Sequence, residues 1–101
     1  MQNYFSGSMN DLFRSIMLLK SEEECRAFFE DLCTIKELQD MAQRLETARL
    51  LFEGRNYQEI SREVGISSTT ISRVSRCLNY GKGGYETVIS RLGGREKKDE
   101  V

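Results

Sequence analysis

The stretch Tyr57–Leu78, YQEISREVGISSTTISRVSRCL, decides the fold that we predict for this chain. Apolar residues recur at three- and four-residue steps on both sides of Gly65, which predicts two short helices joined by a tight turn. This is the pattern of a helix-turn-helix, whose two helices are held at a steep angle. The small core between them is expected to consist of Ile60, Val64, Ile66, Ile71 and Val74.

The turn between the two predicted helices places special demands on two residues. Gly65 lies where the chain needs a positive φ, a conformation that costs a residue with a Cβ about 1 kcal/mol or more. Ser61 is small where the second helix would press against the first. A glycine and a small residue in this register favour a helix-turn-helix over a generic helical hairpin.

The second helix of such a motif enters the major groove of DNA, and its first turns face the base edges. Hydroxyl groups there bind phosphates or bases, and arginine binds the two acceptors of guanine. Ser67 or Ser68 is also expected to cap the helix. The predicted DNA-binding residues are Ser67, Ser68, Thr69, Thr70, Ser72, Arg73 and Arg76, with Arg62, Lys82 and Arg55 as candidates for backbone contacts.

The distribution of charge along the chain supports this interpretation, although the net charge is only −1. Residues 1–60 have a net charge of −4, whereas residues 61–92 carry five basic and two acidic side chains, a net charge of +3. Between Glu63 and Glu86 there is no acidic residue. A nearly neutral average therefore conceals a basic segment, and the local field attracts nucleic acid.

The rest of the chain predicts further helices, so the expected fold class is all-α with about six helices. The first begins after a cap at Ser8 or Asn10, the second after Ser21, and the third runs from Thr34 to a stop at Gly54. The apolar stripe of the third helix is expected to be Leu38, Met41, Ala42, Leu45, Ala48, Leu51 and Phe52. Asn56 is the expected cap of the first helix of the motif, and the second ends near Asn79.

The expected domain organisation is a single helical DNA-binding domain at 8–92, with the helix-turn-helix at 57–78. Residues 1–7 are expected to be a flexible lead-in. The final helix is expected to end at Leu92, before Gly93 and Gly94, and 93–101 to be a charged, disordered tail. The first helices have more apolar surface than one thin layer hides, which suggests either an ordinary core or a second copy of the chain.

Composition argues against several other classes of protein. Histidine is absent, no phosphate-binding loop follows a strand, and the three cysteines have no C-x-x-C spacing, so we expect no enzyme, no catalytic residue and no metal site. Cys25, Cys33 and Cys77 are expected to be reduced thiols. No apolar run is long enough to cross a bilayer and no signal peptide is recognised, so a cytoplasmic protein without a membrane partner is expected.

The chain resembles the trp repressor superfamily, and most closely its YerC/YecD-type branch of trp repressor-like proteins. The resemblance covers about residues 9–92 and is carried by DLCTIKE, AQRLETAR and TTISRVSRCLNYG. It implies six helices per chain, an intertwined homodimer, and two recognition helices that meet successive major grooves of a near-palindromic operator in double-stranded DNA. The trp repressor is itself a standard example of this docking geometry.

The resemblance also implies a candidate ligand pocket formed by Thr34, Arg44, Arg73 and Cys77. The family prototype holds its tryptophan corepressor between two arginines, which Arg44 and Arg73 match. Cys77 replaces a serine of that pocket and Val74 replaces a glycine, which argues against tryptophan itself. A different small-molecule corepressor, or the absence of any ligand, both fit these residues, and we prefer the second interpretation.

The predicted function is therefore sequence-specific transcriptional regulation, as a repressor that occupies an operator as a homodimer. The alternative is a protein-interaction module that keeps the helix-turn-helix shape without reading DNA. That alternative predicts a recognition face without net positive charge, and the acid-free span between Glu63 and Glu86 argues against it.

Overall fold

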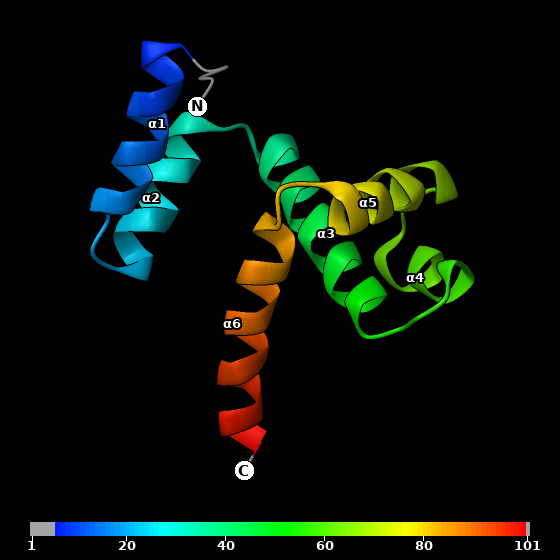
Figure 1. Cartoon of the computed structure of the whole chain (residues 1–101). Coiled ribbons are helices and arrows are strands. Elements are labelled where there is room, and N and C mark those ends of the chain that lie inside the picture. The colour runs from blue at the N-terminus through cyan, green and yellow to red at the C-terminus, as the bar shows by residue number, and fades with distance from the viewer. Residues whose placement is uncertain (1–5, 101) are drawn as a thin grey trace. The chain divides into compact units, whose positions relative to one another are not determined.

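The computed structural model describes the backbone of residues 6–100 and the side chains of residues 6–93. Within that range the chain is entirely helical, with no strand, which confirms the predicted fold class (Figure 1). The chain divides into two compact units, residues 1–38 and residues 39–101, which are described separately. The helices are α1 (Gly7–Leu18), α2 (Glu22–Leu32), α3 (Ile35–Phe52), α4 (Tyr57–Val64), α5 (Ser68–Tyr80) and α6 (Gly84–Glu100).

The first unit contains α1, α2 and the start of α3. Ser6 caps α1 by accepting a hydrogen bond from the backbone N–H of Met9, so the prediction of Ser8 or Asn10 was wrong. The predicted lead-in 1–7 largely precedes the described residues, and Gly7 already belongs to α1. Ser21 caps α2 as predicted, accepting from the N–H of Glu24 at 3.1 Å. Local hydrogen bonding thus begins both helices.

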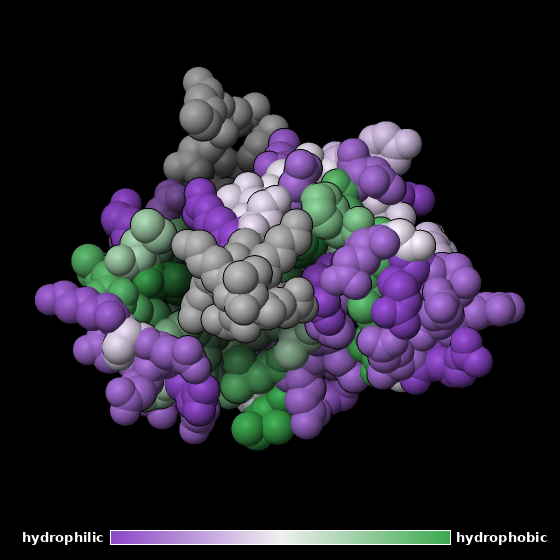
Figure 2. All heavy atoms as spheres, turned by 90° about the horizontal axis from the view of Figure 1, so that it is seen from below, coloured by the Kyte–Doolittle hydropathy of each residue, from purple (hydrophilic) through white to green (hydrophobic). Residues whose placement is uncertain are grey.

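Hydrophobic side chains remain at the surface of this unit. No side chain of α1 or α2 is buried. Met17 and Leu18 are 82% and 74% exposed, and Ile35 at the start of α3 is 66% exposed. Figure 2 shows hydrophobic residues in green at the surface, with hydrophilic residues between them. Other apolar residues of the two helices, such as Ile16, Phe28 and Phe29, are half-buried, so the apolar faces are only partly covered in the single chain.

Both ends of α3 are fixed by the motifs that the sequence predicted. Thr34 and Glu37 form a capping box, in which each side chain accepts from the other residue's backbone N–H, at 3.0 and 2.8 Å. At the other end Gly54 has a φ of +91°. Its N–H donates to the carbonyl of Leu51 and the N–H of Arg55 to that of Leu50, which is the Schellman arrangement.

The core of the second unit consists of two clusters that share α3. One contains Leu50, Ile60 and Ile71 and joins α3 to α4 and α5, with Leu51, Val64 and Ile66 packed against it. The other contains Ala48, Val74 and Ile89 and joins α3 to α5 and α6. Val74 therefore does not belong to the cluster of Ile60 and Ile71, where the sequence had placed it. Figure 1 shows α4 beside α5.

The turn between α4 and α5 has the predicted geometry. Gly65 has φ +80° and ψ +36°, and its N–H donates to the carbonyl of Ser61. The hydroxyl of Ser61 donates to the carbonyl of Ile66 at 2.7 Å, across the turn. Asn56 caps α4 in a complete capping box with Glu59, and Ser67 caps α5 by accepting from the N–H of Thr70. The start of α5 is thus fixed to α4 by short-range hydrogen bonds.

The last helix is longer than the sequence predicted. It follows α5 after three residues and continues through Gly93 and Gly94 to Glu100, so the expected end at Leu92 was wrong. Glycine lowers helix stability by about 1 kcal/mol at each position but is no absolute stop, and the segment that follows is rich in Glu and Lys, which favour helix. The start is fixed by Gly83, whose carbonyl accepts from the N–H and hydroxyl of Thr87.

Candidate nucleic-acid interface

Packing against α3 and α4 decides which face of α5 remains open. Ile71 and Val74 are 0% and 2% exposed, because they face the two core clusters. Positions on the other side of the helix cannot reach these clusters. Ser68, Thr69, Ser72, Arg73, Arg76 and Cys77 are all exposed.

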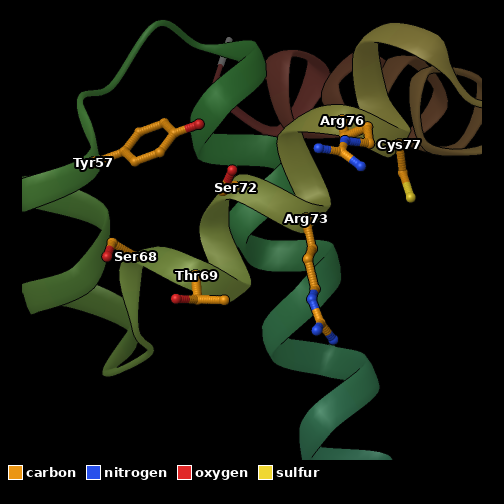
Figure 3. A pocket seen from close by; sticks show the side chains of 7 residues that line it. All are labelled: Tyr57, Ser68, Thr69, Ser72, Arg73, Arg76 and Cys77. Carbon is orange, nitrogen blue, oxygen red and sulfur yellow. The ribbon is translucent and has the colours of Figure 1, made fainter.

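These six side chains line an open groove together with Tyr57 from the first turn of α4 (Figure 3). We call it the α5 groove; its volume is about 740 Å³. Figure 3 shows Arg73 and Arg76 leaving the helix in different directions, with Ser72 facing the side from which Tyr57 projects. The groove thus presents hydroxyl groups and two guanidinium groups on one surface.

The electrostatic character of this surface is positive. Neither Arg73 nor Arg76 has an ion-pair partner among the described side chains, and no acidic residue lines the groove. Free guanidinium groups next to hydroxyl groups are the donors that bind phosphate oxygens and guanine edges. The chemistry of the groove therefore fits an anionic, hydrogen-bonding partner.

The acidic residues of α4 are occupied by a different arginine. Arg55 donates to the carboxylate of Glu63 at 2.6 Å and lies 3.6 Å from that of Glu59. The hydrogen bond and the charge of Glu63 raise the pKa of Arg55 above its ordinary value. Arg55 was a candidate for a DNA-backbone contact; in the structure its guanidinium group binds these two carboxylates.

The remaining predicted DNA-binding residues differ in their surroundings. The hydroxyl of Ser67 accepts the capping hydrogen bond and lies 3.2 Å from the hydroxyl of Thr70, which is half-buried. These two are thus engaged with each other at the helix start. Arg62 on α4 and Lys82 after α5 are exposed and without ion pairs in the part of the chain described.

A second groove lies along α4 and was not predicted. Tyr57, Gln58, Ser61, Arg62 and Ser68 line it, and we call it the α4 groove. Tyr57 and Ser68 line both grooves. The sequence assigned no site role to Tyr57 or Gln58. The available signal was an exposed aromatic residue directly after the capping residue Asn56, on the helix that precedes the recognition helix.

The predicted ligand pocket is only partly assembled. Arg73 and Cys77 line the α5 groove, but Arg44, which is exposed on α3, is not among its lining residues. Thr34 belongs to the first unit, and its hydroxyl accepts the capping hydrogen bond of α3. The carboxylate of Glu46, a possible partner of Arg44, binds Arg49 at 2.7 Å. The pocket therefore stays a prediction.

The described residues form neither a metal site nor a disulfide. The described side chains contain no group of three or more His, Cys, Asp or Glu residues that could hold a metal ion. All three cysteines are free thiols; Cys25 and Cys33 are half-buried and Cys77 is exposed. No described helix combines the length and the apolar character that crossing a bilayer requires.

Comparison with known proteins gives one consistent answer. The sequence is 56% identical to YerC of Bacillus subtilis (strain 168), a protein without an assigned function, over 84 residues that cover 83% of this chain and 81% of YerC. The structure matches that of a TrpR-like protein from Eubacterium eligens ATCC 27750 with a TM-score of 0.83 and 46% identity, covering 87% of this chain and 91% of the other.

A second solved structure, of a proposed Trp repressor from Staphylococcus aureus, also matches with a TM-score of 0.83. It is 39% identical, and the match covers 88% of this chain and 89% of the other. The family model of the Trp repressor protein matches residues 7–93, which include every described helix except the end of α6. Members of this family are regulators rather than enzymes. The chain is therefore a member of the Trp repressor family.

Proposed function

We propose that this protein is a homodimeric, sequence-specific regulator that binds double-stranded DNA through α5 and represses transcription by occupying an operator. The observation that carries the proposal is the arrangement of α5. Its apolar side is fixed against α3, α4 and α6, while Ser68, Thr69, Ser72, Arg73 and Arg76 stand free on the opposite side. A helix held in this way can enter a major groove and present its side chains to base edges.

The division of roles follows from the chemistry of each side chain. Among the described side chains no carboxylate pairs with Arg73 or Arg76, so binding DNA does not require such an ion pair to be broken. Arg62 on α4 and Lys82 after α5 are exposed cations that can neutralise phosphates. The candidates for binding a small corepressor remain Thr34, Arg44, Arg73 and Cys77.

The homodimer is supported by the apolar faces of the first unit, which the single chain covers only in part. No side chain of α1 or α2 is buried, although burial of apolar surface is the dominant driving force of folding. Exposed apolar side chains on both helices mark an interaction surface. A second copy of the chain supplies a symmetric partner for these faces.

The proposal is tested by selecting binding sites from random DNA duplexes with the purified full chain, in the presence and absence of a panel of amino acids. We expect a near-palindromic site with two half-sites about one helical turn apart, since each subunit of a dimer presents one recognition helix. Sedimentation velocity should show a dimer. Affinity for the selected site should fall steeply with salt concentration.

Two results would contradict this function. Recovery of no preferred sequence would exclude sequence-specific reading, and binding of no duplex at all would favour the protein-interaction module. A selected sequence that appears only with one amino acid present would identify a corepressor. The same sequence with and without the panel would support the ligand-free interpretation.

A further inference from the structure

We propose that Tyr57 is a DNA-contacting residue: its phenol hydroxyl donates a hydrogen bond to a phosphate oxygen of the strand that lies along the α4 groove. This inference rests on the proposed DNA binding and adds a contact that lies outside the recognition helix. It assigns α4 a direct role in holding the duplex.

The position of Tyr57 between the two grooves is the first observation. It is the first residue of α4, directly after the capping residue Asn56, and its side chain lines both the α5 groove and the α4 groove. Figure 3 shows the ring projecting from α4 toward the side on which Ser72 lies. The side chain therefore forms the ridge that separates base-reading residues of α5 from polar residues of α4.

The state of the hydroxyl is the second observation. Tyr57 is 41% exposed, and within the described part of the chain its hydroxyl has no hydrogen-bond partner. A tyrosine that served only the core would bury its ring and pair its hydroxyl. The ring of Tyr57 instead combines a partly covered apolar body with a free donor, which suits a contact to sugar and phosphate.

The charge around the ridge selects an anionic acceptor. The other described residues that line the α4 groove are Gln58, Ser61, Arg62 and Ser68, and no described acidic side chain lines either groove. Glu59 and Glu63, the acidic residues of α4, are bound by Arg55. A phosphate in the α4 groove would thus meet the positive charge of Arg62 and neutral donors, without repulsion from a free carboxylate.

The docking geometry of a helix-turn-helix indicates that the acceptor of this hydrogen bond is a phosphate rather than a base. The second helix occupies the major groove while the first crosses the sugar-phosphate backbone. A side chain at the start of α4 therefore meets the backbone rather than a base edge. Tyrosine hydroxyls are among the donors that bind phosphate oxygens and fix the register of a protein on the duplex.

The experiment compares the full-length wild type with Tyr57→Phe on the selected operator, using fluorescence anisotropy over a series of salt concentrations. Phenylalanine keeps the ring and removes only the hydroxyl. We expect a loss of affinity of about tenfold for each subunit, as for one hydrogen bond to a charged acceptor, and so of about a hundredfold for the dimer. The loss should be equal on the operator and on its single-base variants, because a phosphate contact carries no base information.

Two control variants define the contact. Tyr85→Phe removes the hydroxyl of a half-buried tyrosine that packs against the Ala48 cluster, and it should leave the affinity unchanged. Arg62→Ala, in the same groove as Tyr57, should reduce the slope of log affinity against log salt by about 1 for each subunit, or about 2 for the dimer, whereas Tyr57→Phe should leave it unchanged because a phenol is neutral.

Single methylphosphonate linkages then locate the phosphate. Replacing one linkage in each half-site should weaken the wild type more than Tyr57→Phe, since the variant has lost the hydrogen bond already and loses only the attraction of Arg62 to the phosphate charge. The proposal would be overturned if the effects of Tyr57→Phe and of the methylphosphonate were additive at every linkage, or if Tyr57→Phe bound with wild-type affinity. It would also be overturned if the loss in Tyr57→Phe were confined to one base pair, or if Tyr85→Phe lost as much affinity. So would a lowered unfolding midpoint of Tyr57→Phe. Failure of the wild type to bind any duplex would overturn the proposed function and this contact together.

Discussion

Substitution of Gly65 tests whether the turn between α4 and α5 has the left-handed conformation on which the placement of the recognition helix depends. Gly65 has φ +80° and ψ +36°, and a Cβ built on it would meet no heavy atom within 4 Å. Alanine at this position therefore introduces no collision. The whole penalty comes from the backbone conformation, which makes its size predictable.

The magnitude follows from the cost of the left-handed region. Gly65→Ala should destabilise the protein by about 1–2 kcal/mol. Gly65→Asn should cost less, because asparagine tolerates this region, and Gly65→Val more, up to about 3 kcal/mol for a β-branched side chain. In a domain of this size each kcal/mol lowers the unfolding midpoint by about 4–8 °C. We further expect Gly65→Val to detach or reorient α5 and to abolish operator binding.

Thermal unfolding followed by circular dichroism, at one fixed protein concentration, measures the three variants. Gly84→Ala is the matched control, since Gly84 begins α6 without a positive φ and its added Cβ also meets nothing within 4 Å. It should be neutral or slightly stabilising. We predict that the Asn variant is the most stable of the three and the Val variant the least, and any other order would refute the reasoning. A Gly65→Val protein that is as stable as the wild type and binds the operator would also refute it.

Three further predictions concern α5 and the core beneath it. Arg73→Ala should weaken operator binding by about 1–3 kcal/mol in each half-site and relax base selectivity, with unchanged unfolding, since the side chain is exposed and has no ion pair among the described side chains; titration against operator variants measures this. Leu50→Ala should lower the free energy of unfolding in urea by about 2–5 kcal/mol, because Leu50 is 1% exposed and supports the contact of α3 with α4 and α5. Cys77 should react with a maleimide more slowly when operator is bound, while the reactivity of Cys25 and Cys33 should not depend on DNA.

Each of these has a result that would contradict it. Unchanged operator affinity of Arg73→Ala would exclude this arginine from reading bases. A loss below about 1 kcal/mol for Leu50→Ala would mean that the cluster contributes little to holding α5. Equal labelling of Cys77 with and without operator would place the duplex away from the α5 groove.

Much of the helical framework was predictable because its signals are local. The capping boxes of Thr34 with Glu37 and of Asn56 with Glu59 link residues three positions apart, so the sequence shows donor and acceptor together. The positive φ of Gly54 and Gly65 has the same local origin. The misplaced cap of α1 and the unexpected continuation of α6 through Gly93 are errors of boundary, where neighbouring serines or glycines offer nearly equal alternatives.

The sequence by itself thus determined the helices, the helix-turn-helix and the basic segment, because periodicity, capping and charge are properties of neighbouring residues. Tertiary structure alone decided which sides of the helices are buried and which line the grooves. Thr47 and Leu50 are buried although neither belongs to the predicted stripe of α3, since α3 packs against two clusters at once. Tyr57 borders both grooves only because α4 and α5 are brought together by Ile60, Ile71 and Leu50, and such distant contacts leave no signal at the position of Tyr57 in the chain.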